Sequence, residues 1–129
     1  MTNESALNED QTGRVLEIAM DLAREGKTAQ LAEFIDHGLA VDVVDADGNT
    51  LLMLAAYHGR TETVGMLLGH GANPDIQNVR KQTPIAGALF KGEDDVVAKL
   101  CAAGADLDAG TPTAREAAAM FGREHLLTT

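Results

Sequence analysis

A period of 33 residues runs through most of the sequence and constrains the fold more than any other feature. Two glycine series keep this step: Gly26, Gly59 and Gly92, then Gly38, Gly71 and Gly104. The aspartates Asp42, Asp75 and Asp108 keep it too. So do three apolar series: Leu31, Val64 and Val97; Phe34, Leu67 and Leu100; Ile35, Leu68 and Cys101. A step held by three classes of residue predicts a solenoid, in which each repeat buries its apolar face against the next.

Within one period the pattern predicts two helices, each closed by a glycine. Thr50 can cap a helix over Leu51–His58, because its hydroxyl can accept a hydrogen bond from a backbone N–H of the first turn. Gly59 ends that helix in a conformation that is least costly without a Cβ. A second helix is expected over about Thr61–His70, and residues 72–75 have the composition of a turn.

These residues resemble the ankyrin repeat. The segment 47–59, DGNTLLMLAAYHG, is similar to the family pattern D-x-x-G-x-T-P-L-H-x-A-A-x-x-G, with Asp45 in the usual aspartate position. Residues 71–73 and 104–106 match the G-A-D/N that ends a repeat, and residues 83–85 carry the T-P-L element again. The resemblance covers about residues 14–127. It implies an all-α solenoid of helix-turn-helix units, about four repeats including two irregular caps.

We expect units at about 14–44, 45–77, 78–110 and 111–127, the first and last being the caps. A flexible acidic tail, 1–13, and a short tail, 128–129, would flank this single domain. The small size and the Ala-, Met- and Gly-rich helices favour a stand-alone ankyrin-repeat protein of bacterial type.

Several positions depart from the family pattern. Met53 and Ala86 replace the histidine that links neighbouring turns. Lys81 replaces a turn glycine, which predicts a distorted or more flexible loop between repeats, here called a finger. The last unit, beginning at Thr113, comes three residues early, which predicts a shortened finger.

Charge and composition exclude several classes of function. A formal net charge of −10 opposes sequence-independent binding to nucleic acid or to an anionic membrane. No apolar stretch is long enough to span a bilayer, and the N-terminus lacks the features of a signal peptide. Cys101 is the sole cysteine and cannot form an internal disulfide, which favours a reducing cytoplasm.

The resemblance implies that partners contact the fingertips and the exposed ends of the inner helices, which form a concave groove. Carried over by position, the fingertip residues are Asp47, Asn49, Arg80 and Gln82. The residues at the inner-helix ends are Arg24, Glu25, Tyr57, His58, Phe90 and Lys91. The sequence therefore predicts a protein–protein interaction module, or adaptor, that binds a soluble protein.

Tyr57 and Phe90 are the most informative of these residues, because they occupy equivalent positions one repeat apart. Exposed aromatic residues often mark an interface, although each ring could instead seal the junction with its neighbouring repeat. Beside Phe90, the cations Arg80, Lys81 and Lys91 could receive an acidic patch of the partner, or could form a solvated charged turn.

The sequence gives no sign of catalysis, and we expect no enzyme activity, cofactor or metal site. The histidines His37, His58 and His70 lack a tight ligand spacing, and Cys101 falls in an apolar series. His37 and His70 end outer helices, where a histidine can bond the last carbonyls. The acidic run 93–95 fits a helix start capped by Asp94.

Two alternatives remain open. A self-associating structural or stabilising subunit would use Phe121, Leu126 and Leu127, because a short final helix, Glu124–Leu127, would leave them poorly covered. A small-molecule or metal binder would need a deep pocket with convergent polar groups. The expected assembly is a monomer or a weakly self-associating chain.

Overall fold

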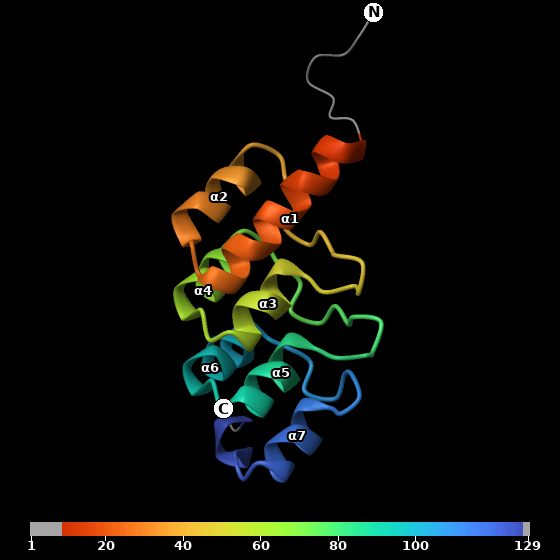
Figure 1. Ribbon diagram of the computed structural model, residues 1–129. Helices are drawn as coiled ribbons and strands as arrows, with labels where there is room; N and C mark the ends of the chain where they lie inside the picture. The colour runs from red at the N-terminus through yellow and green to blue at the C-terminus, as the bar shows by residue number, and fades with distance from the viewer. Residues whose placement is uncertain (1–8, 128–129) are drawn as a thin grey trace, which may run out of the picture.

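The computed structural model describes residues 9–127, which form an all-α solenoid (Figure 1). Its helices are α1 Glu9–Glu25, α2 Thr28–Asp36, α3 Leu51–Tyr57, α4 Thr61–Gly69, α5 Pro84–Lys91, α6 Asp94–Ala102 and α7 Ala114–Met120, followed by the 3₁₀ helix η1 Glu124–Leu127. Apart from an isolated bridge between Val44 and Thr50, the described residues contain no β-structure.

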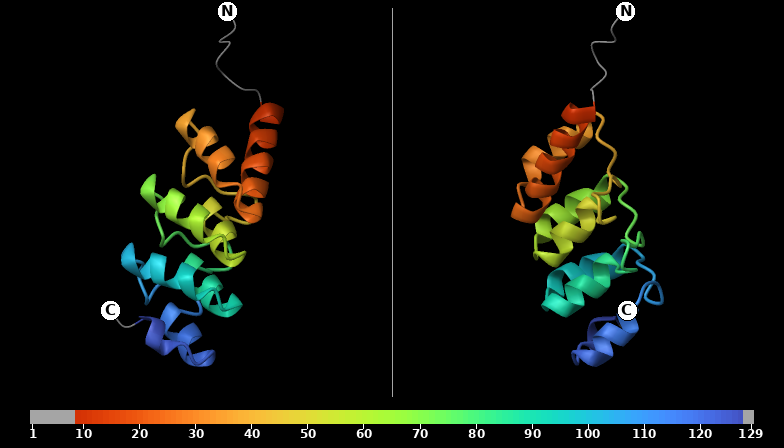
Figure 2. Two further views of the ribbon diagram at one scale, coloured as in Figure 1. Left: turned by 90° about the vertical axis from the view of Figure 1, so that its left-hand side faces the viewer. Right: turned by 45° about the vertical axis from the view of Figure 1, so that its right-hand side comes forward.

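The helices stack in two layers as antiparallel pairs. The inner layer runs α1, α3, α5, α7 and the outer layer α2, α4, α6, η1, with each helix touching its neighbours in the same layer (Figure 1). The fingers, residues 37–50, 70–83 and 103–113, all leave the stack on the same side (Figure 2). The arrangement confirms the expected solenoid.

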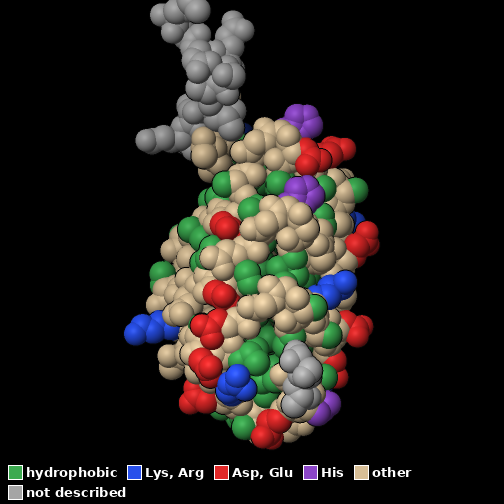
Figure 3. Space-filling model, turned by 180° about the vertical axis from the view of Figure 1, so that it is seen from behind, with side chains coloured by type: hydrophobic (Ala, Val, Ile, Leu, Met, Phe, Trp, Pro, Cys, Tyr) green, Lys and Arg blue, Asp and Glu red, His purple; other side chains and the backbone are tan. Residues whose placement is uncertain are grey.

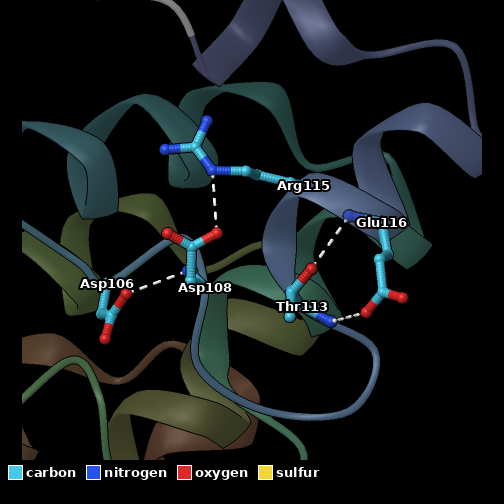
Figure 4. A network of polar contacts seen from close by, with 5 residues as sticks. All are labelled: Asp106, Asp108, Thr113, Arg115 and Glu116. Atoms are coloured by element: carbon cyan, nitrogen blue, oxygen red, sulfur yellow. Dashed lines mark hydrogen bonds and ion pairs between the residues drawn. The ribbon is translucent and has the colours of Figure 1, made fainter.

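Threonine hydroxyls cap the amino-terminal ends of three inner helices, as proposed for Thr50. The Thr50 side chain accepts a hydrogen bond from the backbone N–H of Met53 at 3.1 Å, and Thr83 caps α5 in the same way. Thr113 forms a reciprocal capping box with Glu116 at the start of α7 (Figure 4). Because these bonds satisfy otherwise unpaired N–H groups, they fix where each inner helix starts.

The 33-residue apolar series form the core between the two layers. Leu31, Val64 and Val97 have no exposed surface, and the same holds for Leu67 and Leu100. The third series lies at the edge of the core, where Ile35, Leu68 and Cys101 are half-buried. Burial raises the pKa of the Cys101 thiol, consistent with an apolar packing role.

The first helix begins earlier than the sequence suggested. Residues 9–13, expected to belong to a flexible tail, form the first turns of α1. The remainder of the expected tails, residues 1–8 and 128–129, lies outside the described residues.

The finger that contains Lys81 is not distorted, so this part of the prediction was wrong. Lys81 adopts the left-handed conformation with φ 64°, close to the φ of 78° at the equivalent Gly48. Both fingers also use the same turn. The Oδ1 atom of Asp45 accepts hydrogen bonds from two backbone N–H groups, both at 2.9 Å. The Oδ1 atom of Asn78 accepts the two equivalent bonds at 2.9 Å and 3.0 Å. These bonds hold a lysine in a conformation that glycine adopts at lower cost.

Aspartates of the 33-residue series join neighbouring loops. Asp42 accepts a hydrogen bond from the backbone N–H of Asn73 at 3.0 Å, and Asp75 accepts one from Asp106 at 2.7 Å. The last member, Asp108, accepts from the Nε of Arg115 at 2.9 Å (Figure 4). Each repeat therefore uses the same aspartate to tie itself to the next.

The carboxyl-terminal cap is shortened as expected, but it is better covered than expected. α7 starts at Ala114, three residues before the position that the 33-residue step gives. Leu127 is only 9% exposed and Leu126 is half-buried, because η1 packs against α6 and α7. Of the three residues proposed to be poorly covered, only Phe121 is exposed.

Two expectations about helix ends have different outcomes. His37 and His70 do bond the last carbonyls of the outer helices, with Nδ1 at 2.7 Å from Glu33 O and 2.9 Å from Met66 O. Asp94 does not cap α6. It is the first residue of that helix and forms an ion pair with Arg123.

The residues directly before the outer helices α4 and α6 lie against the carboxyl end of the inner helix of the repeat before. Arg60 lies against Gly26 and donates from Nε to the carbonyl of Arg24 at 2.7 Å. The carboxylate of Glu93 lies against Gly59 in the same way. A side chain from one repeat therefore covers each of these inner-helix ends in the repeat before it.

Candidate protein-binding groove

A hollow of about 550 Å³ lies between the fingers and the last three inner helices. Six of the ten predicted contact residues line it: Asn49, Tyr57, His58, Arg80, Gln82 and Phe90. The fold therefore brings fingertip and inner-helix residues to one surface, as the resemblance implied.

The floor of the hollow is apolar because two residues replace the family's histidine. Met53 is 7% exposed and Ala86 is 6% exposed, and both line the hollow. The neighbouring fingers are instead joined by Asn78, whose Nδ2 donates to Asn49 Oδ1 at 2.9 Å, and by a bond from the Val79 N–H to the carbonyl of Asp47 at 3.0 Å.

Four large apolar side chains lie on the inner-helix side of the hollow and are exposed to solvent. Their exposed fractions are 41% for Tyr57, 61% for Phe90, 67% for Met120 and 40% for Phe121. The rings of Phe90 and Phe121 meet edge to face with centroids 5.6 Å apart. Phe90 thus touches the next repeat, as a junction residue would, yet keeps most of its surface open to a partner. We call these four residues the apolar rim.

Met120 was missed by the sequence analysis, and Phe121 was considered only as a residue for self-association. Tyr57 and Phe90 each follow the capping threonine by seven residues, and Met120 follows Thr113 by the same number. Met120 is therefore the third member of the series, displaced by the three residues missing from the last finger. Aligning the units on the capping threonine, instead of on a constant step, would have found it.

The cations expected to form one basic patch are separated. Arg80 and Lys81 lie in the finger before α5, whereas Lys91 is the last residue of that helix. An eight-residue helix is about 12 Å long, so the two groups lie at opposite ends of α5. The Lys91 Nζ sits 5.1 Å from the centre of the Tyr57 ring, which is a cation–π distance.

His58, at the end of α3, has a pKa below the ordinary value for histidine. Its pKa is lowered, first by burial and then by the positive charges of Arg60, Arg24 and Lys91. The ring of His58 also meets the Tyr57 ring edge to face, with centroids 5.5 Å apart. The lowered pKa favours the neutral imidazole beside the Tyr57 ring.

The other predicted contact residues lie outside the main hollow. Arg24 lines a second hollow of about 380 Å³ beside α1, together with Asp45. Asp47 and Glu25 are exposed and line neither hollow. The candidate site is thus centred on the last three repeats rather than spread over all four.

Acidic side chains are spread over the face seen from behind, opposite the view of Figure 1 (Figure 3).

Among the described residues, no group of three or more His, Cys, Asp or Glu could hold a metal ion. No helix in the same part of the chain is long and apolar enough to cross a membrane.

Stacked helix pairs, projecting fingers and a hollow between them define an α-helical repeat protein of the solenoid class. The family described as "Ankyrin repeats (3 copies)" matches residues 19–111, so the chain belongs to the ankyrin-repeat family. No match is found among curated protein sequences. Ankyrin repeats are in general protein–protein interaction modules rather than enzymes.

Proposed function

We propose that this protein is an adaptor that binds a soluble protein partner through the groove beside the apolar rim. The observation that carries the proposal is the rim itself. Tyr57, Phe90 and Met120 repeat along successive inner helices and stay 41%, 61% and 67% exposed. Water-exposed apolar side chains of this size favour association, and aromatic residues contribute strongly to binding free energy.

The shape of the hollow supports a polypeptide ligand. It extends over three repeats and combines an apolar floor with polar fingertip residues such as Gln82 and Arg80. Arg80 and the adjacent Lys81 are exposed cations in a chain of net charge −10, so we propose that they face an acidic part of the partner. We place this encounter in a bacterial cytoplasm, on the basis of composition and the single cysteine.

Affinity capture with matched variants tests this proposal. Wild-type protein should retain a partner from native lysate that Tyr57→Ala and Phe90→Ala each lose. The control is Ile18→Ala, because Ile18 is 48% exposed but lines neither hollow. Equal capture by all four proteins would refute the groove as the binding surface.

Melting temperatures of the same variants separate binding from packing. If Tyr57→Ala and Phe90→Ala melt several degrees lower and release no captured protein, the rings seal repeat junctions instead. Light scattering over a range of concentrations tests the alternative of self-association. If the mass doubles with concentration in wild type but not in Phe121→Ala, the result supports self-association, with a second copy of the chain as the partner.

A further inference from the structure

Four basic side chains gather at the carboxyl ends of the inner helices. Arg24 is in the last turn of α1, His58 follows α3, Arg60 precedes α4, and Lys91 ends α5. We call these residues the rim cluster. Its members come from three repeats, so only the stacking of the solenoid brings them together.

Several contacts show that the cluster is compact. Arg60 reaches back to the carbonyl of Arg24, with its Nε 2.7 Å from that oxygen. Lys91 lies over the ring of Tyr57, and that ring meets the imidazole of His58. The charges of all three cations act on His58. These contacts place the four side chains near one another, with His58 at the edge of the hollow.

The positive charge of the cluster is only partly compensated by the described part of the chain. Arg24 forms an exposed ion pair with Asp21 at 2.8 Å. Glu25 is the next residue along α1, and Glu93 rests against Gly59, but neither makes an ion pair with a member of the cluster. Among described residues, no carboxylate pairs with His58, Arg60 or Lys91. In a protein of net charge −10, Arg60 and Lys91 are therefore cations without an ion pair to a described carboxylate.

We propose that the rim cluster binds a carboxylate of the partner polypeptide, an Asp or Glu side chain that enters the groove beside Tyr57. This inference rests on the proposed function, because Tyr57 and His58 line the same hollow. The apolar rim would receive the apolar side chains of the bound segment, and the cluster its carboxylate. The acidic surface elsewhere opposes longer polyanions such as RNA.

Binding of the carboxylate is coupled to protonation of His58. The surrounding cations and burial disfavour the imidazolium in the free protein, which lowers its pKa. A bound carboxylate offsets those cations and raises the pKa of His58. The complex then holds a proton that the free protein does not, so affinity increases as the pH falls below the ordinary histidine pKa of about 6.5.

Two synthetic peptides test the proposal by NMR. One is acetyl-Asp-Glu-Phe-Glu-Asp-amide, and the other replaces its acids by Asn and Gln. The ring signals of His58, assigned with His58→Gln, are titrated with pH in the free and peptide-bound protein. We expect the acidic peptide alone to raise the pKa of His58, while His37 in another part of the fold does not change.

The outcomes separate the two proposals. If both peptides shift the signals of Tyr57 and Phe90 equally and the pKa of His58 stays unchanged, the groove stands and the carboxylate site is refuted. If neither peptide shifts those ring signals, the result counts against the groove and therefore against both proposals. Equal pKa changes at His58 and His37 would indicate general screening and would also refute the site.

A pair of charge variants adds an independent test. Lys91→Gln should weaken binding of the acidic peptide by about two- to fivefold, the range for one exposed charge pair, and leave the amide peptide unaffected. The control is Lys99→Gln, which removes the same charge from the outer helix α6. Equal weakening by both variants would refute a local site. His58→Gln should remove the increase in affinity that accompanies a fall in pH below about 6.5.

Discussion

Replacing Lys81 by glycine should stabilise the protein. Lys81 has φ 64°, in the left-handed region that side chains with a Cβ rarely adopt. Two backbone hydrogen bonds hold Lys81 in this conformation. The Lys81 N–H donates to the carbonyl of Asn78 at 2.9 Å, and the Lys81 carbonyl accepts from the N–H of Thr111 at 2.8 Å. Since the side chain is exposed, its removal should cost little packing.

The expected gain is the difference between two opposing effects. The left-handed conformation costs a residue with a Cβ about 1–2 kcal/mol, which glycine avoids. Glycine also loses more backbone entropy on folding, which destabilises the Lys81→Gly variant by about 0.4–1 kcal/mol. Lys81→Gly should therefore raise the free energy of unfolding by about 0.5–1 kcal/mol, or the melting temperature by roughly 2–5 °C.

Urea unfolding followed by far-UV circular dichroism measures this change, provided that the m-value stays constant. The control is Arg80→Gly in the same finger. Arg80 does not have a positive φ, so glycine brings the entropic cost without relief of strain and should destabilise the protein. If both variants lose stability to the same extent, Lys81 is not strained and the reasoning fails.

Three further changes test other parts of the structure. The carbonyl of Met66 and the carboxylate of Asp36 raise the pKa of His70 in the folded protein. The stability that His70 contributes should therefore be complete below pH about 6.5 and be lost as the pH rises through the higher folded pKa. Urea unfolding of His70→Gln should show no such loss. Leu127→Ala should cost about 2 kcal/mol in denaturant unfolding, because Leu127 is buried, and a cost near zero would mean that η1 does not cover the cap. Thr113→Ala should cost about 1 kcal/mol by removing a helix cap, whereas Thr113→Ser, which keeps the hydroxyl, should melt within about a degree of wild type.

Much of the fold could be predicted because its signals are local. A threonine hydroxyl such as that of Thr50 bonds within its own first turn, and Gly59 adopts its left-handed conformation for steric reasons inside one residue. Such features repeat with the 33-residue step, so an observation in one repeat applies to the next. The start of α1 at Glu9 was not predicted, because it lies before the part of the chain that the 33-residue pattern covers.

The candidate site was predicted in part for the same reason. Tyr57 and Phe90 were found because they hold equivalent positions in regular repeats. Met120 was missed because a shorter finger displaces the series by three residues. Lys81 was expected to make its finger distorted or more flexible, but the hydrogen bonds of Asn78 and Thr111 hold the same turn that contains Gly48 in the preceding finger.

The sequence by itself determined the class of fold, the capped inner helices and the residues that occupy equivalent places in successive repeats. These follow from short-range hydrogen bonding, backbone sterics and periodic burial, all of which are visible along the chain. Only the tertiary structure decided which side chains from different repeats meet. It separated Lys91 from Arg80, placed it over the Tyr57 ring, and covered Leu127 with neighbouring helices. Contacts of this kind depend on how the repeats stack and on the directions of individual side chains, which a period does not specify.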